Sequence, residues 1–376
     1  MGNRKEMRVA IVHDYLNQYG GAERVLEVFH KLYPDAPIYT IIYNRTRMPN
    51  YLKKWNIIES FIGKLPFNKS NYEKYFFLMP FAVESFDLSG FDLVISSSSA
   101  WSKSVITLPS TTHICYMHNP MRFVWHSYHP LINARKGLTK LMLFLLLHFL
   151  RLWDENTSKR PDIIVANSKN VSKRIKKFYG IESSIVYPPV NTDFFTPGEN
   201  IKKEDFFLIV SRLRPYKRID IAIRAFNEMK LPLLIIGEGS MRGRLERIAN
   251  RNIQFLGRRS DDEVRSFYRR ARGVIFPTFE DFGIVPLEAS GCGTPVISFK
   301  QGGATETIIE GVNGKFFYPQ TPEALMDAVL HFHPEDFNAR DIREVALRFS
   351  EKKFIENFRG VIEAITEQKK NPPFIS

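Results

Sequence analysis

The sequence predicts an α/β protein built from two doubly wound units with mostly parallel sheets. Short β-branched runs alternate with helical patterns along the whole chain, which is typical of parallel sheets covered by helices. A Pro/Gly cluster at residues 188–198 interrupts this alternation near the middle of the chain. The length of 376 residues suits two or three domains of about 150 residues each.

The first unit opens with a strand, a glycine loop and a helix. Residues 8–13 are mostly β-branched or apolar, Gly20 and Gly21 lie in the loop, and residues 22–32 have helical spacing. Further strands are expected at residues 91–96, 113–118, 163–167 and 184–187. We therefore place a first domain at residues 1–190.

The second unit alternates more regularly and follows a linker near residues 188–202. Its strands are expected at residues 206–211, 231–237, 253–257, 274–276 and 295–299. The helices are expected at residues 217–229, 240–250, 261–271, 284–292 and 304–310. This pattern predicts a second domain at residues 191–349. Residues 350–376, with a long helix to about residue 368, are expected to return to the first domain.

Composition excludes several classes of protein. The hydrophobic fraction of 44%, with 31 Phe and 15 Tyr, is too high for a disordered chain. Two cysteines, Cys115 and Cys292, are too few for a disulfide framework and lack the neighbours that a zinc site needs. A reducing compartment is therefore expected.

Positive charge is concentrated in the first half. Through Pro188 the chain has 25 Lys+Arg and 14 Asp+Glu, a net charge of +11, whereas the remainder has 28 and 26, a net charge of +2. This asymmetry indicates either an anionic partner of the first half or a solvated basic surface. The anionic partners to consider are nucleic acid, an anionic membrane leaflet and a pyrophosphate-bearing substrate.

Residues 138–153 form the longest apolar segment. Lys140, His148 and Arg151 interrupt it, so it is not expected to span a bilayer, and the polar residues 1–6 do not resemble a signal peptide. Two interpretations remain open, a helix packed in the first domain and a helix inserted shallowly in a membrane surface. Nearby, five cations fall on one short predicted helix and would favour an anionic surface or simply face solvent: Lys169, Lys173, Arg174, Lys176 and Lys177.

The first chemical motif is Gly20-Gly21-Ala22-Glu23, between the first strand and its helix. Paired glycines let the backbone approach a ligand, and a helix N-terminus offers amide hydrogens to a phosphate. The motif is neither G-x-G-x-x-G nor a Walker loop, and a plain turn would fit the same residues.

The second motif places cations after the first strand of the second unit, in the segment SRLRPYK at residues 211–217. Ligands of doubly wound sheets bind beyond the carboxyl ends of the strands, where Arg212 and Lys217 are expected to neutralise a diphosphate. An exposed basic turn is the alternative interpretation.

The third motif pairs Glu280 with Glu288 across a loop and a helix start. Pro286 suits the first turn of a helix, so four residues before it should present free backbone amides: Phe282, Gly283, Ile284 and Val285. Two carboxylates at this spacing can reach different parts of one extended ligand.

Together these motifs resemble the retaining family 4 glycosyltransferases of the GT-B fold, in which two Rossmann-like domains face each other across a cleft. The resemblance runs from GGAE at residues 20–23 through SRLRPYK and the E-x7-E motif to Gly302-Gly303 and Glu306, and so covers essentially the whole chain. The segments at residues 117–125, 150–168 and 185–195 resemble bacterial mannosyltransferases of O-antigen, capsule and exopolysaccharide assembly.

The resemblance implies a role for each motif residue. Arg212 and Lys217 would hold the donor diphosphate, Glu288 the ribose hydroxyls, and Glu280 the transferred sugar. The amides of Gly20, Gly21 and residues 282–285 would complete the cradle. Residues 256–258, with Arg258, would contact the nucleobase, and His118 would approach the donor sugar, although a histidine after a strand is more often structural.

The resemblance also implies transfer with retention, giving an α-glycoside. Neither Glu280 nor Glu288 matches a nucleophile in the family, so we expect front-face substitution in which a donor phosphate oxygen takes the acceptor proton. The sequence contains no D-x-D motif, and we expect no metal or other cofactor.

The predicted function is therefore the transfer of a hexose, mannose from GDP-mannose, to a lipid-linked oligosaccharide. A UDP-sugar donor (glucosyl, galactosyl or N-acetylhexosaminyl) is the alternative. The enzyme is expected in the cytoplasm, peripheral at the inner face of the cytoplasmic membrane, with its N-terminal domain against anionic lipid. Nucleic-acid binding is disfavoured, because the basic residues are not interleaved with aromatics in an RNA-binding motif. A non-catalytic scaffold is disfavoured by the intact set of motif residues.

Overall fold

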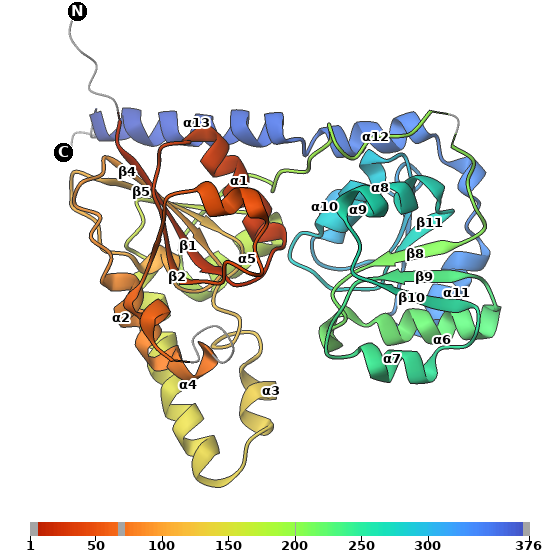
Figure 1. Ribbon diagram of the computed structural model, residues 1–376, viewed down its shortest axis with the longest axis horizontal. Coiled ribbons are helices and arrows are strands. Elements are labelled where there is room, and N and C mark those ends of the chain that lie inside the picture. The colour runs from red at the N-terminus through yellow and green to blue at the C-terminus, as the bar shows by residue number, and fades with distance from the viewer. Residues whose placement is uncertain (1–6, 67–71, 200, 371–376) are drawn as a thin grey trace, which may run out of the picture. The chain divides into compact units, whose positions relative to one another are not determined.

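The computed structural model describes residues 7–66, 72–199 and 201–370. The chain divides into two compact units (Figure 1). Unit 1 comprises Met1–Tyr187 and Ile355–Ser376, and unit 2 comprises Pro188–Phe354. Each unit is a parallel sheet with helices on both faces, so the predicted α/β class with two Rossmann-like domains is confirmed.

The sheet of unit 1 has the order β3-β2-β1-β4-β5-β6-β7 among the described residues, and all of its pairings are parallel. Its strands are β1 (Val9–Leu16), β2 (Ile38–Tyr43), β3 (Ile57–Glu59), β4 (Leu93–Ser98), β5 (Thr112–Met117), β6 (Ile163–Ala166) and β7 (Ser184–Ile185). Its helices are α1 (Gly21–Leu32), α2 (Met79–Glu84), α3 (Tyr128–Asn133), α4 (Gly137–Thr157) and α5 (Lys169–Tyr179).

The sheet of unit 2 has the order β10-β9-β8-β11-β12-β13 and is also parallel throughout. Its strands are β8 (Phe207–Val210), β9 (Leu233–Ile236), β10 (Ile253–Gly257), β11 (Gly273–Phe276), β12 (Val296–Phe299) and β13 (Gly314–Phe317). Its helices are α6 (Ile219–Met229), α7 (Arg242–Ile248), α8 (Asp261–Arg270), α9 (Ile284–Gly291), α10 (Ala304–Thr307), α11 (Pro322–Leu330) and α12 (Ala339–Leu347).

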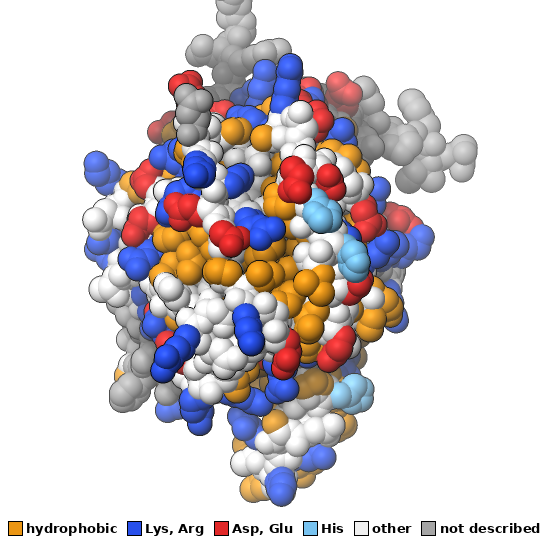
Figure 2. Space-filling view, turned by 90° about the vertical axis from the view of Figure 1, so that its right-hand side faces the viewer, with side chains coloured by type: hydrophobic (Ala, Val, Ile, Leu, Met, Phe, Trp, Pro, Cys, Tyr) orange, Lys and Arg blue, Asp and Glu red, His pale blue; other side chains and the backbone are white. Residues whose placement is uncertain are grey.

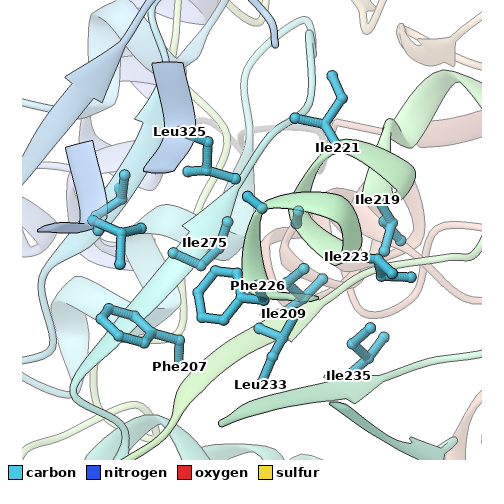
Figure 3. Packing of buried hydrophobic residues seen from close by; sticks show 14 of the residues in the cluster. Phe207, Ile209, Ile219, Ile221, Ile223, Phe226, Leu233, Ile235, Ile275 and Leu325 are labelled. Atoms are coloured by element: carbon cyan, nitrogen blue, oxygen red, sulfur yellow. The ribbon is translucent and has the colours of Figure 1, made fainter. Parts of the chain in front are cut away.

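Alternate residues of the central strands supply two cores in unit 2. Phe207 and Ile209 of β8 pack with α6 and Leu325 of α11 (Figure 3), whereas Leu208 packs on the opposite face. Successive side chains of a strand point to opposite faces, so one short apolar run is buried on both sides. This explains why the strands of unit 2 are almost uninterrupted apolar segments.

The last helix, α13 (Glu351–Lys370), begins in unit 2 and continues into unit 1. Phe358 packs against Phe29 of α1, with 4.8 Å between ring centroids. Near the C-terminal end, the Lys369 ammonium lies 2.9 Å from the Asp162 carboxylate. Most of this helix is thus part of unit 1.

Strand order reverses once in each sheet, between β1 and β4 in unit 1 and between β8 and β11 in unit 2. Loops that leave neighbouring strands in opposite directions open a crevice at such a point, where ligands of doubly wound folds bind. The motifs selected from the sequence follow these strands: Gly20-Gly21 follows β1, SRLRPYK follows β8, and Glu280 follows β11.

Three further features bear on the expectations from the sequence. Cys115 and Cys292 are both free and buried. In the part of the chain that the structure describes, no helix is long and apolar enough to cross a membrane. Figure 2 shows Lys and Arg side chains interspersed with Asp and Glu on the viewed face of unit 2, in keeping with the small net charge of the second half.

Candidate active site

Arg212 and Lys217 lie on the loop that leaves the carboxyl end of β8. Leu213 is fully buried and anchors the loop, while Arg212 between it and the strand is exposed. Lys217 ends the short 3₁₀ helix Pro215–Lys217, and its carbonyl accepts a hydrogen bond from the Thr278 hydroxyl at 2.9 Å. The Arg212 guanidinium donates to the Tyr216 hydroxyl at 3.3 Å. Both cations therefore belong to a loop fixed at the switch point.

The neighbouring loop after β9 packs closely against this loop. The Leu213 amide donates to the Glu238 carbonyl at 2.9 Å, and the Met241 amide donates to the Leu213 carbonyl at 3.0 Å. Gly237 and Gly239 make the approach possible, because a Cβ at either position would lie within 2.2 Å of a carbonyl oxygen of the first loop. The glycines after β9 thus allow this loop to pack against the loop that carries Arg212 and Lys217.

Glu280 and Lys217 form an ion pair across the switch point. Only 11% of the Lys217 side chain and 23% of the Glu280 side chain are exposed. Screening by water is weaker in such a partly buried position, so the pair interacts more strongly than a surface pair. The structure thus brings together two candidate residues that lie 63 positions apart in the sequence.

Gly302 and Gly303 hold the Glu280 loop from the other side. The Gly303 amide donates to the Glu280 carbonyl at 2.8 Å. A Cβ on Gly303 would lie 2.2 Å from the Phe282 Cα, and one on Gly302, where φ is +68°, would lie 2.3 Å from the Glu280 carbonyl oxygen. The Gly-Gly pair is therefore required by close backbone packing.

Helix α9 begins directly after the Glu280 loop. Gly283 adopts a φ of 90° and precedes the first turn, where Ile284 and Val285 are partly exposed. No side chain caps this N-terminus, so the first amides, at the positive end of the helix, receive no side-chain hydrogen bond at the cap. Phe282 is buried and packs on Phe349, with 5.7 Å between ring centroids.

Glu288 lies one turn into α9 and is 5% exposed. The hydroxyl of the buried Tyr268, on α8, donates to its carboxylate at 3.0 Å. Tyr268 was not selected from the sequence, because a tyrosine at an apolar position of a helix has no distinctive pattern. Arg258 is exposed in the loop after β10 and follows Gly257, whose φ is +70°.

In unit 1, Gly20 and Gly21 begin α1 at the switch point between β1 and β4. Gly20 is extended, with φ −160°, and no side chain caps the helix. The motif's Glu23 is buried in the first turn, and its carboxylate lies 3.7 Å from Nε2 of His13. The first motif thus contributes a helix N-terminus and a buried carboxylate.

His118 follows β5 and belongs to a chain of buried and partly buried polar groups. Its Nε2 lies 2.9 Å from the Ser97 hydroxyl, and that hydroxyl lies 3.0 Å from Nδ1 of His13. Burial, with smaller contributions from His13 and Arg122, lowers the pKa of His118 to about 3, so its ring is neutral near pH 7. Because Ser97 has one hydroxyl hydrogen, it donates to one ring and accepts from the other.

Asp14 fixes the loop after β4. Its carboxylate accepts hydrogen bonds from four successive backbone amides, at 2.6 to 3.0 Å: Ser99, Ala100, Trp101 and Ser102. Asp14, His13 and Ser97 were all missed from the sequence. The available signal was polarity at strand ends, namely His13-Asp14 after an apolar run and four serines at residues 96–99.

The five cations selected around residue 173 lie on α5, as expected, and two of them have partners. The Arg174 guanidinium donates to the Asn119 side chain at 3.2 Å, and Lys176 forms an ion pair with Glu182. Burial, with a contribution from Arg122, lowers the pKa of Arg174 to about 10. Two of the five cations therefore have side-chain partners within unit 1.

Two family models together match residues 19–346. Residues 19–194 match Glycosyltransferase Family 4, and residues 191–346 match Glycosyl transferases group 1. The chain belongs to the glycosyltransferases. The family 4 match covers the greater part of unit 1 and the group 1 match that of unit 2, so the motifs at both switch points lie within the matched ranges.

Individual relatives agree with this assignment. The chain is 29% identical over 231 residues to an uncharacterized glycosyltransferase of Methanocaldococcus jannaschii, covering 58% of this chain and 64% of the relative. It is 30% identical over 218 residues to O-antigen chain mannosyltransferase C of Escherichia coli, covering 54% and 57% respectively. Each alignment spans less than two thirds of the relative.

The structural similarity covers more of the chain than the pairwise sequence alignments do. The structure of Anabaena HepE in complex with UDP and glucose matches 95% of this chain and all of its own, with a TM-score of 0.70 at 17% identity. This glycosyltransferase therefore has the GT-B fold. Within the described part of the chain, no group of three or more His, Cys, Asp or Glu side chains is arranged to hold a metal ion.

Proposed function

We propose that this glycosyltransferase transfers a hexose, mannose from GDP-mannose, to a lipid-linked oligosaccharide and forms an α-linkage. The observation that carries the proposal is the Lys217–Glu280 pair at the switch point of unit 2. It sets a cation beside a carboxylate where doubly wound sheets bind nucleotides. The choice of mannose rests on the E. coli O-antigen relative and on the sequence segments that resemble that branch.

In this proposal Arg212 and Lys217 bind the donor diphosphate and stabilise it as the leaving group. Negative charge develops on the diphosphate as the glycosidic bond breaks, and a preorganised, partly buried cation stabilises that charge more than bulk water does. The amides at the start of α9 supply further donors. Glu280 accepts hydrogen bonds from the sugar hydroxyls, and Glu288 from the ribose hydroxyls.

The proposed reaction retains the anomeric configuration without a covalent intermediate. A double displacement would need a free carboxylate as nucleophile. Glu280 is instead paired with Lys217, and Glu288 is buried against Tyr268. We therefore favour front-face substitution, in which a phosphate oxygen of the donor takes the proton of the acceptor hydroxyl. Because the cations supply the electrostatic stabilisation, the reaction is proposed to be independent of metal ions.

A UDP-sugar is the second candidate donor. The HepE structure contains UDP and glucose, and its fold matches 95% of this chain. At 17% identity this similarity supports the fold but does not identify the nucleobase of the donor. The donor must therefore be tested directly.

The acceptor and location are proposed from the O-antigen relative and from the charge of unit 1. A lipid-linked glycan would hold the enzyme at the inner face of the cytoplasmic membrane, as a peripheral protein of lipopolysaccharide or related polysaccharide biosynthesis. The net charge of +11 through Pro188 suits contact of this part of the chain with anionic lipid.

Donor turnover without acceptor tests the proposal. NMR of the full chain with GDP-mannose in excess EDTA should show slow release of GDP and mannose, with the α-anomer formed first. The Lys217→Ala variant should reduce turnover about 100-fold, because the leaving group loses a preorganised cation, while the donor KM changes much less.

The matched control is Lys352→Ala, which removes an exposed lysine of α13 and should leave turnover unchanged. Unchanged turnover in Lys217→Ala would remove the proposed role of Lys217. Consumption of UDP-glucose in place of GDP-mannose would keep the transferase and overturn the sugar assignment.

A further inference from the structure

Helix α4 carries apolar side chains on two opposite faces. One face is buried in unit 1 through Leu147, Leu150, Asp154 and Thr157, which follow the i, i+3, i+7, i+10 spacing of a single helix stripe. The other face is exposed and also has helical spacing: Leu138, Leu141, Met142, Leu145, Phe149 and Leu152. These six residues are 49% to 71% exposed, and we call them the α4 stripe.

The buried face fixes the rotation of the helix. The Asp154 carboxylate lies 2.6 Å from the ammonium of the buried Lys103 and accepts hydrogen bonds at 2.7 Å from both the Trp125 indole and the Tyr179 hydroxyl. Breaking this buried network to turn the helix over would leave charges without partners, which is strongly unfavourable. The α4 stripe therefore faces solvent as a consequence of how α4 is anchored.

The stripe extends onto a helical hairpin. Figure 1 shows α3 and the first turns of α4 projecting together beyond the rest of unit 1. Between them is a shallow, largely apolar hollow of about 320 Å³ lined by Ile132, Gly137, Lys140, Leu141 and Phe144. Leu131 of α3 is also exposed, so the apolar surface is wider than one helix at the tip.

The charged side chains at the tip of the hairpin are positive. Between Asp92 and Asp154 the chain contains no acidic residue. Arg135, Lys136 and Lys140 are exposed at the tip, next to the first leucine of the stripe. The exposed carboxylate of α4, Glu155, lies at the opposite end of the helix from these cations. An exposed apolar stripe with cations at its N-terminal border complements an anionic lipid surface, in which headgroups attract the cations and acyl chains receive the apolar side chains.

We propose that the α3–α4 hairpin docks on an anionic bilayer, with the α4 stripe inserted at the level of the headgroups and Arg135, Lys136 and Lys140 on the phosphates. The stripe covers one face of α4, and the opposite face is fixed in the protein, so the helix lies in the interface and does not cross it. A second copy of the chain fits less well, because it would bring the same three tip cations to the interface and only one exposed carboxylate of α4, Glu155. This inference does not depend on the proposed sugar transfer.

Vesicle flotation of the full chain, with no nucleotide or acceptor present, tests the proposal. Binding to phosphatidylglycerol-containing vesicles should be at least 10-fold tighter than to phosphatidylcholine vesicles and should weaken with salt. The double variant Leu141→Asp, Leu145→Asp should bind at least 10-fold more weakly. Both leucines are more than half exposed, so the variant should keep the wild-type melting temperature.

Matched controls separate the stripe from general surface effects. Ile106→Asp with Leu330→Asp changes two equally exposed apolar residues elsewhere and should leave vesicle binding unchanged. Lys136→Gln with Lys140→Gln should weaken binding about 10-fold or more, whereas Lys230→Gln with Lys352→Gln should not.

Three results would overturn the proposal. The first is that the wild type binds neither kind of vesicle, and the second is that the Leu141→Asp, Leu145→Asp variant binds as tightly as the wild type. The third is that the wild type sediments as a dimer and this variant as a monomer. The last result would assign the stripe to a second copy of the chain. None of them measures donor turnover, so failure here and failure of the proposed function are distinguishable.

Discussion

At the scale of single residues, the polar chain through Ser97 is the feature that most directly positions a candidate catalytic group. The Ser97 hydroxyl joins Nε2 of His118 at 2.9 Å to Nδ1 of His13 at 3.0 Å, and His13 lies near the buried Glu23. A neutral His118 has one ring nitrogen that donates and one that accepts, and its partner decides which. Ser97 therefore acts as a positioning residue for His118.

We predict that Ser97→Ala lowers kcat about 10-fold with little change in donor KM, because His118 is no longer held in one orientation. Ser97→Thr, which keeps the hydroxyl, should recover most of the activity. Because the pKa of His118 is about 3, the pH profile of wild-type activity should show no inflection from this residue between about pH 5 and 9.

Ser96→Ala is the matched control. Ser96 is the preceding residue of β4, is equally buried and bonds a different histidine, with its hydroxyl 2.8 Å from Nε2 of His113. The Ser96→Ala substitution should lower the free energy of unfolding by about as much as Ser97→Ala does and should leave kcat unchanged. Equal losses of kcat in the two variants would mean that Ser97 is merely structural.

At the scale of elements, close backbone packing between loops sets the shape of the donor site. Gly303 has an ordinary helical φ of −64°, which any residue can adopt. A glycine is needed at this position because there is no room for a side chain. Its Cβ position lies 2.2 Å from the Phe282 Cα, on the loop that carries Glu280. Any side chain here must displace that loop.

We predict that Gly303→Ala destabilises unit 2 by about 1–3 kcal/mol, in the range of overpacked sites, and raises the donor KM by moving the Glu280 loop. Urea unfolding and donor kinetics measure the two effects. Gly243→Ala, on α7 with nothing within 4 Å of its Cβ position, should be neutral or slightly stabilising. A Gly303→Ala variant that behaves like Gly243→Ala would contradict the packing argument.

The order of elements in unit 2 could be predicted from the sequence as far as α10, because the strands up to β12 are short, mostly apolar runs. Strand β13, which begins Gly314-Lys315, and the helices α11 and α12 were not predicted. The boundaries in unit 1 were also less certain. The strand β4 was expected at residues 91–96 and lies at Leu93–Ser98, because Ser97 and Ser98 are buried against polar partners and so do not look like strand residues. The expected helix at 304–310 ends at Thr307. The Ile308 amide still donates to the Ala304 carbonyl, and the Ile309 amide donates to the Asn313 side chain at 2.7 Å instead of continuing the helix.

The site could be predicted only where its signal is local. Glycine pairs, the basic loop and the two glutamates are visible in the sequence. The Lys217–Glu280 pair, the His13–Ser97 bond between residues 84 apart, and the Tyr268–Glu288 bond depend on which strands become neighbours, and no local pattern reports that. The two faces of α4 likewise required the position of its buried anchor.

At the scale of the whole molecule, buried neutral histidines should make the protein sensitive to acid. Burial, with smaller contributions from Lys369 and Arg160 and against an opposing effect of Asp162, lowers the pKa of His113 from 6.5 to about 4. Between these values the unfolded chain binds a proton that the folded chain does not, so stability falls as pH decreases through this window. One pKa unit corresponds to about 1.4 kcal/mol, so this group contributes on the order of 3 kcal/mol of acid sensitivity.

We predict that His113→Gln flattens the dependence of unfolding free energy on pH between about 6.5 and 4, while the slopes of the two proteins agree above pH 7.5. Urea unfolding at a series of pH values measures this. Parallel curves across the whole range would show that His113 does not contribute.

Unit 2 is proposed to bind a nucleoside diphosphate sugar, and the decisive test is the thermal shift of the full chain with GDP, UDP and ADP in excess EDTA. A nucleotide at 100 times its Kd should add about 2.7 kcal/mol of stability, enough to raise the Tm by several degrees. We expect this rise with GDP and GDP-mannose, and we expect Glu288→Gln to lose it relative to that variant's own baseline. A rise with UDP alone would contradict the donor assignment, and no response to any nucleotide would contradict the claim itself.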